Sequence, residues 1–349
     1  MPKRNTNSGF TIVEFLVVLV AIAIIAAITL VGYNLILQNA IATSLQTNLK
    51  NAAKQLVVDG VRSTTGVFPA TLAVANNGSG INFPSTTTTT YKVDNTDTPK
   101  TFCLTATQNS QTYFITQEAT PLPGPCPALY LDPGLQSSYS GTGTVLTDLS
   151  GNGNNGVISG GVSYSNSYGG VLVFDGASGT VTITDPVSGI LDFGNNNFTI
   201  SVWVKFPLAG SSTWDGIISK GYTSSAPANT WGIVTGNPVT GLYYEDSVNA
   251  GGSFNANYSF SSVPVSNLHN VAVTRSGGTA YKFYLDGVQN GLLTSGQTAN
   301  LSNANDVLIG VAGGRFLNSS IGEIRIYNQA LTANDIRNNF NALRVRCGL

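Results

Sequence analysis

A run of apolar residues near the amino terminus constrains this chain more than any other feature. Between Phe15 and Val31 the only polar residue is Thr29. As a helix, the run would span roughly 25 Å, close to the thickness of a bilayer core. Lys3 and Arg4 precede it, so we expect the amino terminus to lie in the cytoplasm and the rest of the chain to lie outside.

Two residues in front of this run are not explained by a plain membrane anchor. Glu14 lies at the edge of the apolar helix, where an ionised carboxylate is unfavourable unless it is paired or reaches back to water. Cleavage after Gly9 would leave a new amino group on Phe10, and that amine could neutralise Glu14 of a neighbouring subunit. An ordinary secretory signal is cleaved after its apolar run, not before it.

The residues Gly9-Phe10-Thr11-Ile12-Val13-Glu14 resemble the start of type IV pilins and pseudopilins, and no position departs from that signature. The resemblance implies that a prepilin peptidase removes residues 1–9 and N-methylates Phe10. The apolar run then passes from the cytoplasmic membrane into the core of an extracellular pilus. The implied partners are other pilin subunits and the inner-membrane pilus assembly machinery.

Residues 10–60 are expected to form one helix that ends near Asp59 and Gly60. Apolar residues recur at helical spacing beyond Val31 and would form a buried stripe: Leu35, Ile36, Ile41, Leu45, Leu49, Ala52, Ala53 and Leu56. Residues 61–120 would cover that stripe as a small head. In it, residues 101–106 and 112–116 alternate like two strands of a hairpin around Asn109-Ser110.

The head also resembles those of some bacterial pilins, and this resemblance implies a disulfide between Cys103 and Cys126. The alternative is Cys126 with Cys347, because a β-sandwich often brings its ends together. An oxidising compartment allows either pair and leaves one cysteine over. With so few cysteines and His269 as the single histidine, no spacing suits zinc.

A proline-rich connector, residues 121–127, is expected to hold the next domain away from the filament axis. From residue 128 to 349, short strand-like runs alternate with glycine-rich turns, which predicts an all-β sandwich or jelly roll. The expected fold class is therefore α+β: a long helix with a small β head, followed by an all-β domain.

Motifs in this second part follow the order seen in the laminin-G-like, concanavalin A-like jelly rolls of bacterial surface proteins. They include residues 148–156, 173–176, 198–205, 269–275 and 322–331. Two positions depart from the pattern: Leu268 stands where the family often has Trp, and Gly322 where it often has Asp. The resemblance implies a lectin-type domain, often with a structural calcium ion.

A glycine-rich loop carries the best candidate calcium ligands. Oxygen side chains stand there on alternate positions, and calcium takes six to eight oxygens: Asp148, Ser150, Asn152 and Asn154. Asp175 and Glu323 are weaker candidates for the same site. In the alternative interpretation, the loop is a turn in which Asp148 accepts hydrogen bonds from its own backbone.

Aromatic residues are candidates for a carbohydrate platform, because sugar rings stack on flat apolar faces: Trp214, Tyr222, Tyr243 and Tyr244, with Trp231 and Tyr258 also considered. The alternative is that each lies in the core. Catalysis is not expected, because the only adjacent acidic pair, Glu245-Asp246, would point to opposite faces of a strand. Charged residues are 9% and the net charge is −1, so no basic field points to nucleic acid.

The expected function is that of a structural subunit of a type IV pilus. The size of the second domain favours a minor, tip-located pilin that binds a glycan or glycoprotein on a host or partner cell. Three alternatives remain at this point: a major pilin that displays the domain along the filament, a structural cap that binds nothing, and a pseudopilin of a secretion or DNA-uptake system.

Overall fold

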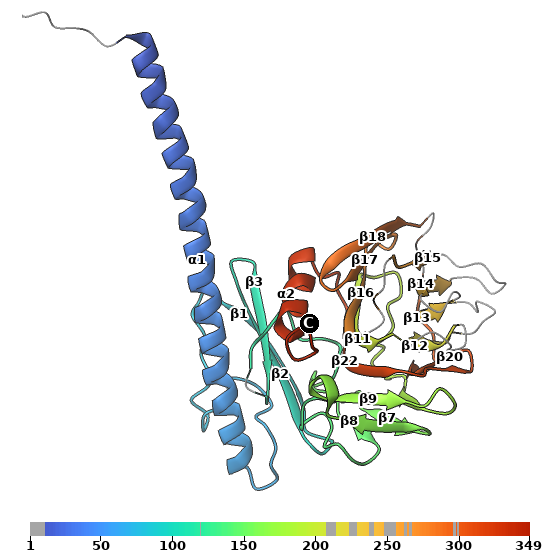
Figure 1. Ribbon diagram of the computed structural model, residues 1–349. Helices are drawn as coiled ribbons and strands as arrows, with labels where there is room; N and C mark the ends of the chain where they lie inside the picture. The colour runs from blue at the N-terminus through green and yellow to red at the C-terminus, as the bar shows by residue number, and fades with distance from the viewer. Residues whose placement is uncertain are drawn as a thin grey trace, which may run out of the picture.

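The computed structural model describes residues 11–118, 120–206, 214–222, 229–236, 241–247, 256–261, 264, 267–295, 298 and 300–349. Gly9 and Phe10, the predicted processing site, lie outside these residues. Figure 1 shows a long helix, a small sheet against its lower half, and a two-layered β domain on the other side of that sheet.

Helix α1 runs without interruption from Ile12 to Arg62, two residues beyond the predicted end. Thr11 caps it: the Thr11 Oγ1 accepts a hydrogen bond from the Glu14 amide, and the Glu14 carboxylate accepts one from the Thr11 amide. The predicted stripe is buried from Ile41 to Leu56. Leu35 and Ile36 are exposed instead, because the head begins to cover the helix only near Gln38, which pairs with Gln111 at 2.8 Å.

The head is a four-stranded antiparallel sheet in the order β1 (Thr88–Asp94), β2 (Thr101–Gln108), β3 (Gln111–Thr116), β4 (Leu122–Pro123). The predicted hairpin is confirmed as β2–β3, and both turn residues, Asn109 and Ser110, have positive φ. Side chains alternate along β2, so Phe102 and Leu104 pack on α1, whereas Cys103 faces away from the helix.

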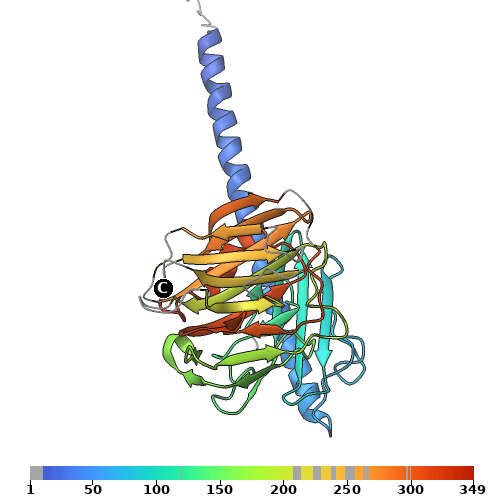
Figure 2. The same cartoon turned by 90° about the vertical axis from the view of Figure 1, so that its right-hand side faces the viewer.

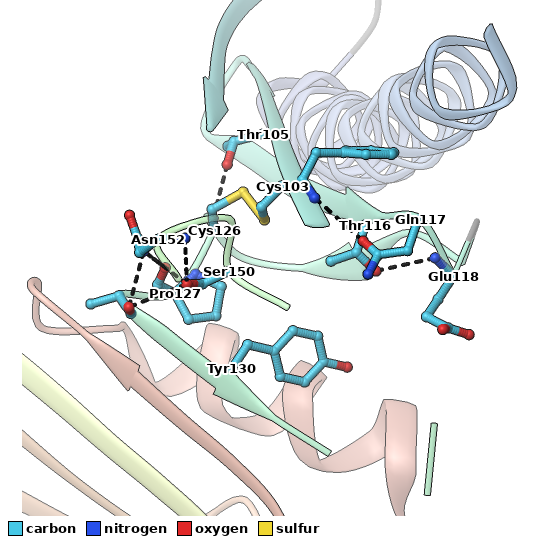
Figure 3. The surroundings of a disulfide bond; sticks show 12 residues. Cys103, Thr105, Thr116, Gln117, Glu118, Cys126, Pro127, Tyr130, Ser150 and Asn152 are labelled. Atoms are coloured by element: carbon cyan, nitrogen blue, oxygen red, sulfur yellow. Dashed lines mark hydrogen bonds between the residues drawn. A yellow bond between two sulfur atoms is a disulfide. The ribbon is translucent and has the colours of Figure 1, made fainter. Parts of the chain in front are cut away.

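The connector, predicted to hold the next domain away from the filament axis, is itself part of the head. Leu122 and Pro123 form β4 and pair with β3, so the connector starts inside the head sheet. Cys126 is bonded to Cys103, and its amide donates to Thr105 Oγ1 at 2.8 Å (Figure 3). The disulfide implied by the pilin resemblance is therefore confirmed, and pairing with Cys347, which is free and buried, is wrong.

The β domain is a sandwich of two antiparallel sheets. The near sheet faces the head and has the order β18 (Val288–Thr294), β17 (Ala280–Leu285), β16 (Leu268–Ser276), β11 (Phe198–Lys205), β22 (Ser320–Tyr327), β9 (Val171–Phe174), β8 (Val162–Ser165), with β5 (Leu129–Leu131) paired to β22. The far sheet has the order β15 (Ala256–Ser259), β14 (Gly241–Ser247), β13 (Thr230–Gly236), β12 (Gly216–Lys220), β19 (Val307–Ile309), β10 (Thr180–Ile183), β7 (Gly156–Ser159), β6 (Val145–Leu146). A small hairpin, β20 (Val311–Ala312) and β21 (Arg315–Phe316), and a short 3-10 helix, η1 (Ser167–Gly169), complete the domain.

The main core lies between the two sheets and includes Ile200 and Val202 of β11 and Trp231 and Ile233 of β13. Trp203 points the other way, as the alternation along β11 predicts. It stacks on Phe340 of helix α2 (Ala333–Leu343), with ring centroids 5.6 Å apart. Helix α2 thereby covers the outer face of the near sheet on the side of the head (Figure 1).

Candidate functional site

The amino-terminal half of α1 is a bare apolar surface. Its large side chains between Ile12 and Leu37 are between 40% and 80% exposed. Among the described residues, α1 is also the one helix long and apolar enough to cross a membrane. Both carboxylate hydrogen bonds that the structure records for Glu14 come from Thr11, at 2.8 Å each. Pairing of Glu14 with a neighbouring subunit stays a prediction.

The loop predicted to hold calcium, residues 148–156, makes the contact between the jelly roll and the head, and we call it the docking loop. A side chain at Gly151 would meet the Lys92 carbonyl oxygen at 2.8 Å, so only glycine fits there. Asn155 donates to Asp97 of the head at 2.6 Å. Leu149 packs with Cys103 and Phe114 of the head.

The side chains of the docking loop hold the loop itself. The Asp148 carboxylate accepts hydrogen bonds from the Tyr130, Ser150 and Asn154 amides and from the Ser150 hydroxyl. Asn152 and Asn154 each donate from the side-chain amide to the Ala128 carbonyl. Figure 3 shows Asn152 beside Ser150 and Pro127. The loop's own carboxylate thus already accepts four hydrogen bonds, as in the alternative interpretation of the loop as a turn that Asp148 holds together.

The two weaker calcium candidates have other partners. Asp175 accepts hydrogen bonds from the amides of residues 177–179, and these bonds lower its pKa to about 2. Glu323 is buried in an ion pair with Arg325. Within the described part of the chain, no three His, Cys, Asp or Glu side chains gather as a metal site. Calcium binding remains an untested prediction.

Arg325 lies at the centre of the junction between the jelly roll and the head. Its guanidinium is 4.9 Å from the ring centroid of Tyr130, in the jelly roll, and 5.4 Å from that of Phe114, in the head. The two rings meet edge to face at 5.9 Å. Glu323 supplies the opposite charge, and all four side chains are buried. The junction is therefore a desolvated contact that joins the two parts closely.

Three of the predicted platform residues come together on the outer surface of the far sheet. Trp214 and Tyr243 are half-buried, with ring centroids 5.2 Å apart, and pack against the more deeply buried Tyr222. Val234 and Ala312 complete the cluster, which we call the aromatic patch. The fourth predicted residue, Tyr244, is not part of it. It is fully buried between the sheets, because neighbouring residues on β14 point to opposite faces.

Two glycines of β13 make room for the rings of the aromatic patch. A side chain at Gly236 would meet the Tyr243 ring at 2.0 Å, and one at Gly232 would meet Tyr222 at 3.0 Å. Both rings therefore lie directly over strand backbone. Gly232 and Gly236, four residues apart on one strand, are a sequence signal that could have located the patch.

One acidic side chain accompanies the aromatic patch. Glu245 accepts hydrogen bonds from the Tyr222 hydroxyl and, at 2.8 Å, from the Asn257 amide. Burial raises the pKa of Glu245, and these hydrogen bonds act in the opposite direction. Asp246 lies on the other face of β14, where it accepts from Tyr244 at 2.9 Å. Glu245 is itself buried, so it holds Tyr222 and Asn257 in place, and the groups that the patch exposes are the rings of Trp214 and Tyr243 with the Asn257 amide beside them.

Two stretches of the chain match known families. Residues 4–30 match the prokaryotic N-terminal methylation motif, and residues 175–337 match the concanavalin A-like lectin/glucanases superfamily. The chain joins a type IV pilin leader to a lectin-like jelly roll. No protein of curated function matches it.

Solved structures with the same fold include receptor-binding domains of botulinum neurotoxins. The domain of the C/D mosaic serotype is 14% identical, with a TM-score of 0.50 over 62% of this chain and 51% of that one. The domain of neurotoxin DC is 17% identical, with the same TM-score over 62% and 52%, in structures with rat synaptotagmin II and with SialylT. This chain therefore matches about half the length of these domains, and the likeness concerns the fold alone.

Proposed function

We propose that this protein is a subunit of a type IV pilus that binds a surface glycan or glycoprotein through the aromatic patch. Its leader and exposed apolar helix support assembly with other pilin subunits after processing between Gly9 and Phe10. The jelly roll is then carried outside the cell. The single observation that carries the binding role is the pair Trp214 and Tyr243, two partly exposed rings that pack with Tyr222 on the outer surface of the far sheet.

The chemistry of the aromatic patch fits a sugar. The apolar face of a pyranose stacks on aromatic rings, and its hydroxyls exchange hydrogen bonds with carboxylate and amide groups. We propose binding and not catalysis, because glycosidases need two carboxylates that face one sugar and Asp246 faces away from Glu245. The neurotoxin domains were solved with SialylT and with synaptotagmin II, which supports testing both glycans and proteins as ligands.

The test is binding of the full-length protein, solubilised in detergent, to a broad glycan array and to host or partner cell surfaces. We expect selective binding that Trp214→Ala and Tyr243→Ala each weaken roughly tenfold or more. Leu292→Ala is the matched control, because Leu292 is an exposed apolar side chain on β18, in the other sheet. Equal binding by all four proteins would overturn the patch as the ligand site. A folded protein that binds no glycan and no cell surface would contradict the adhesive role.

A further inference from the structure

The hairpin formed by β20 and β21 borders the aromatic patch. It lies beside β12, on the side of the molecule away from the head (Figure 1), and Figure 2 looks directly onto that side. The Ser219 hydroxyl of β12 donates to the Val311 carbonyl at 3.1 Å. The Gly310 amide, just before the hairpin, donates to the Ile217 carbonyl at 3.0 Å. The hairpin is therefore tied to the far sheet and has a defined position next to the patch.

The turn of this hairpin places Arg315 at the edge of the patch. Gly313 and Gly314 form the two-residue turn with positive φ, and the Gly313 amide donates to the Tyr222 carbonyl at 3.2 Å. Arg315 pairs with Ala312 across the hairpin, and residues paired in this way project their side chains from the same face. Since Ala312 packs inside the patch, the exposed side chain of Arg315 starts on the patch side of the hairpin.

The Tyr222 hydroxyl lies within reach of two opposite charges. Burial raises the pKa of Tyr222, Glu245 raises it further through a hydrogen bond and its charge, and Arg315 lowers it. Among the described residues, these are the two charged side chains that shift this pKa. They differ in exposure, because Glu245 is buried whereas Arg315 is exposed. A ligand on the surface of the patch can therefore contact the positive charge but not the negative one.

Exposed rings beside an exposed cation favour an acidic sugar over a neutral one. The rings of Trp214 and Tyr243 offer flat apolar faces for a pyranose ring. An arginine guanidinium presents parallel N–H donors that match the two oxygens of a carboxylate, and such charge-assisted hydrogen bonds are stronger than those to a neutral hydroxyl. A sugar with a carboxylate would use both features of the patch, whereas a neutral sugar would use the rings alone.

We propose that the aromatic patch binds an acidic glycan, with a sugar ring against Trp214 and Tyr243 and the sugar carboxylate on Arg315. This proposal rests on the proposed glycan-binding function of the same patch and names the class of glycan. Arg315 itself supplies the positive charge, so the carboxylate contact does not require a bridging metal ion. The attraction between opposite charges also makes binding sensitive to salt.

Matched glycans test the role of the charge without any change to the protein. Oligosaccharides that carry uronic or sialic acids are compared with their carboxyl methyl esters, which keep the sugar ring and lose the charge. We expect the full-length protein in detergent to bind the acids roughly threefold to tenfold more tightly than the esters at low ionic strength. This preference should decrease as the salt concentration rises and should persist in the presence of a chelator.

Three outcomes of this comparison would overturn the proposal. Equal binding of acids and esters would show that the patch recognises neutral sugars. Tighter binding of sulfated than of carboxylated glycans would replace the carboxylate by a sulfate as the recognised group. Loss of the preference in chelator would show that a metal ion, and not Arg315, holds the carboxylate.

Substitution of Arg315 assigns the preference to this residue. Arg315→Gln should lower the affinity for the acids to that for the esters and leave ester binding unchanged, and Arg315→Lys should keep part of the preference because it keeps the charge. Arg337→Gln is the matched control, since it removes the same charge from an exposed position on α2. The melting temperature of each variant verifies that it is folded. Equal weakening of acid and ester binding by Arg315→Gln would contradict a direct contact with the carboxylate.

Failure of this proposal can be distinguished from failure of the proposed function. Trp214→Ala should weaken the binding of acids and esters alike, because both stack on the same rings. A neutral-sugar site would keep this dependence on Trp214 and lose the preference for acids. If neither acids nor esters bound, or if Trp214→Ala weakened neither, the glycan-binding function of the patch itself would be refuted.

Discussion

The junction and the aromatic patch use the same chemical groups for different purposes. At the junction, the Arg325 guanidinium lies against the rings of both Tyr130 and Phe114 and is paired with Glu323. At the patch, Glu245 is hydrogen-bonded to Tyr222 beside the ring of Tyr243. Each site is a charged group among aromatic rings on the outer surface of one of the two sheets.

Solvent exposure separates the two sites. At the junction, Arg325, Glu323, Tyr130 and Phe114 are buried, and the two rings, from different parts of the molecule, contact each other. Trp214 and Tyr243 at the patch keep part of their rings exposed. A closed aromatic and charged cluster stabilises the protein, whereas an open one offers its surface to a ligand. Residue type therefore does not distinguish a binding site from a structural contact.

The largest effect is expected from breaking the junction. Arg325→Ala leaves Glu323 buried without its partner, which should reduce the free energy of unfolding by about 3–5 kcal/mol. Chemical denaturation of the detergent-solubilised protein measures this loss. Arg337→Ala, an exposed arginine on the same side of the molecule, is the control and should leave stability unchanged. A loss below about 1 kcal/mol for Arg325→Ala would show that the junction is not a tight contact.

The same variant should be sensitive to pH. Burial raises the pKa of Glu323 from 4.5 to about 7, and Arg325 works against this rise. A carboxyl group with a raised pKa in the folded state stabilises the fold when it is protonated, so its contribution is lost as pH rises from 4.5 towards 7. Without Arg325 the pKa rises further. The decrease in the free energy of unfolding caused by Arg325→Ala should therefore be larger at about pH 8 than at about pH 5.

Substitution of two neighbouring tyrosines allows the stability contributions of the core and of the patch to be compared directly. Tyr244→Ala removes a fully buried ring and should reduce the free energy of unfolding by about 3–5 kcal/mol. Tyr243→Ala removes a half-buried ring and should reduce it by roughly 1 kcal/mol, while weakening ligand binding roughly tenfold. Denaturation and ligand titration of both variants measure the contrast. If the two variants lost stability equally, Tyr243 would belong to the core and the patch would lose its main ligand residue.

Loss of the disulfide should have the next largest effect. The bond joins residues 23 apart, so replacing Cys103 and Cys126 by Ser should reduce the free energy of unfolding by about 3 kcal/mol. Binding to the aromatic patch should not change while the protein is folded, since the patch lies in the other sheet. Cys347→Ala is the control and should change stability by roughly 1 kcal/mol or less. A change in ligand affinity on removal of the disulfide would mean that junction and patch are coupled.

The smallest effect is expected from calcium. Because Asp148 already accepts four hydrogen bonds in the docking loop, neither millimolar calcium nor a chelator should change the melting temperature. Differential scanning calorimetry of the full-length protein tests this. A rise in melting temperature that requires calcium, and that Asp148→Asn abolishes, would restore the calcium site predicted from the loop sequence.

Local patterns in the sequence predicted much of the fold. The spacing of residues close together in the chain predicts three features of the fold. They are the buried stripe from Ile41 to Leu56, the β2–β3 hairpin and the core-facing side of β11. The resemblance to pilins supplied the Cys103–Cys126 disulfide, which spacing alone left open.

Features that depend on contacts between distant residues could not be predicted from local sequence patterns. The docking loop has the composition of a calcium loop, and its true partners, Lys92 and Asp97, lie more than fifty residues earlier in the chain. Similarly, nothing local shows which of Tyr243 and Tyr244 faces the core, because both residues suit either side of a strand. Only the register of β14 on β13, which pairs Tyr244 with Ile233, settles this.

The Cys103–Cys126 bond also determines how the molecule carries mechanical load. In the proposed function, a ligand held at the patch while the pilus is under tension pulls on the jelly roll, and the covalent path of this pull enters the head at residue 126, beside the contacts of Arg325 and the docking loop. There it passes across the disulfide into the inner strand β2 and bypasses residues 104–125. The short edge strand β4 therefore lies outside the covalent load path. In the proposed function, the disulfide thus keeps this covalent load off the short pairing between β4 and β3.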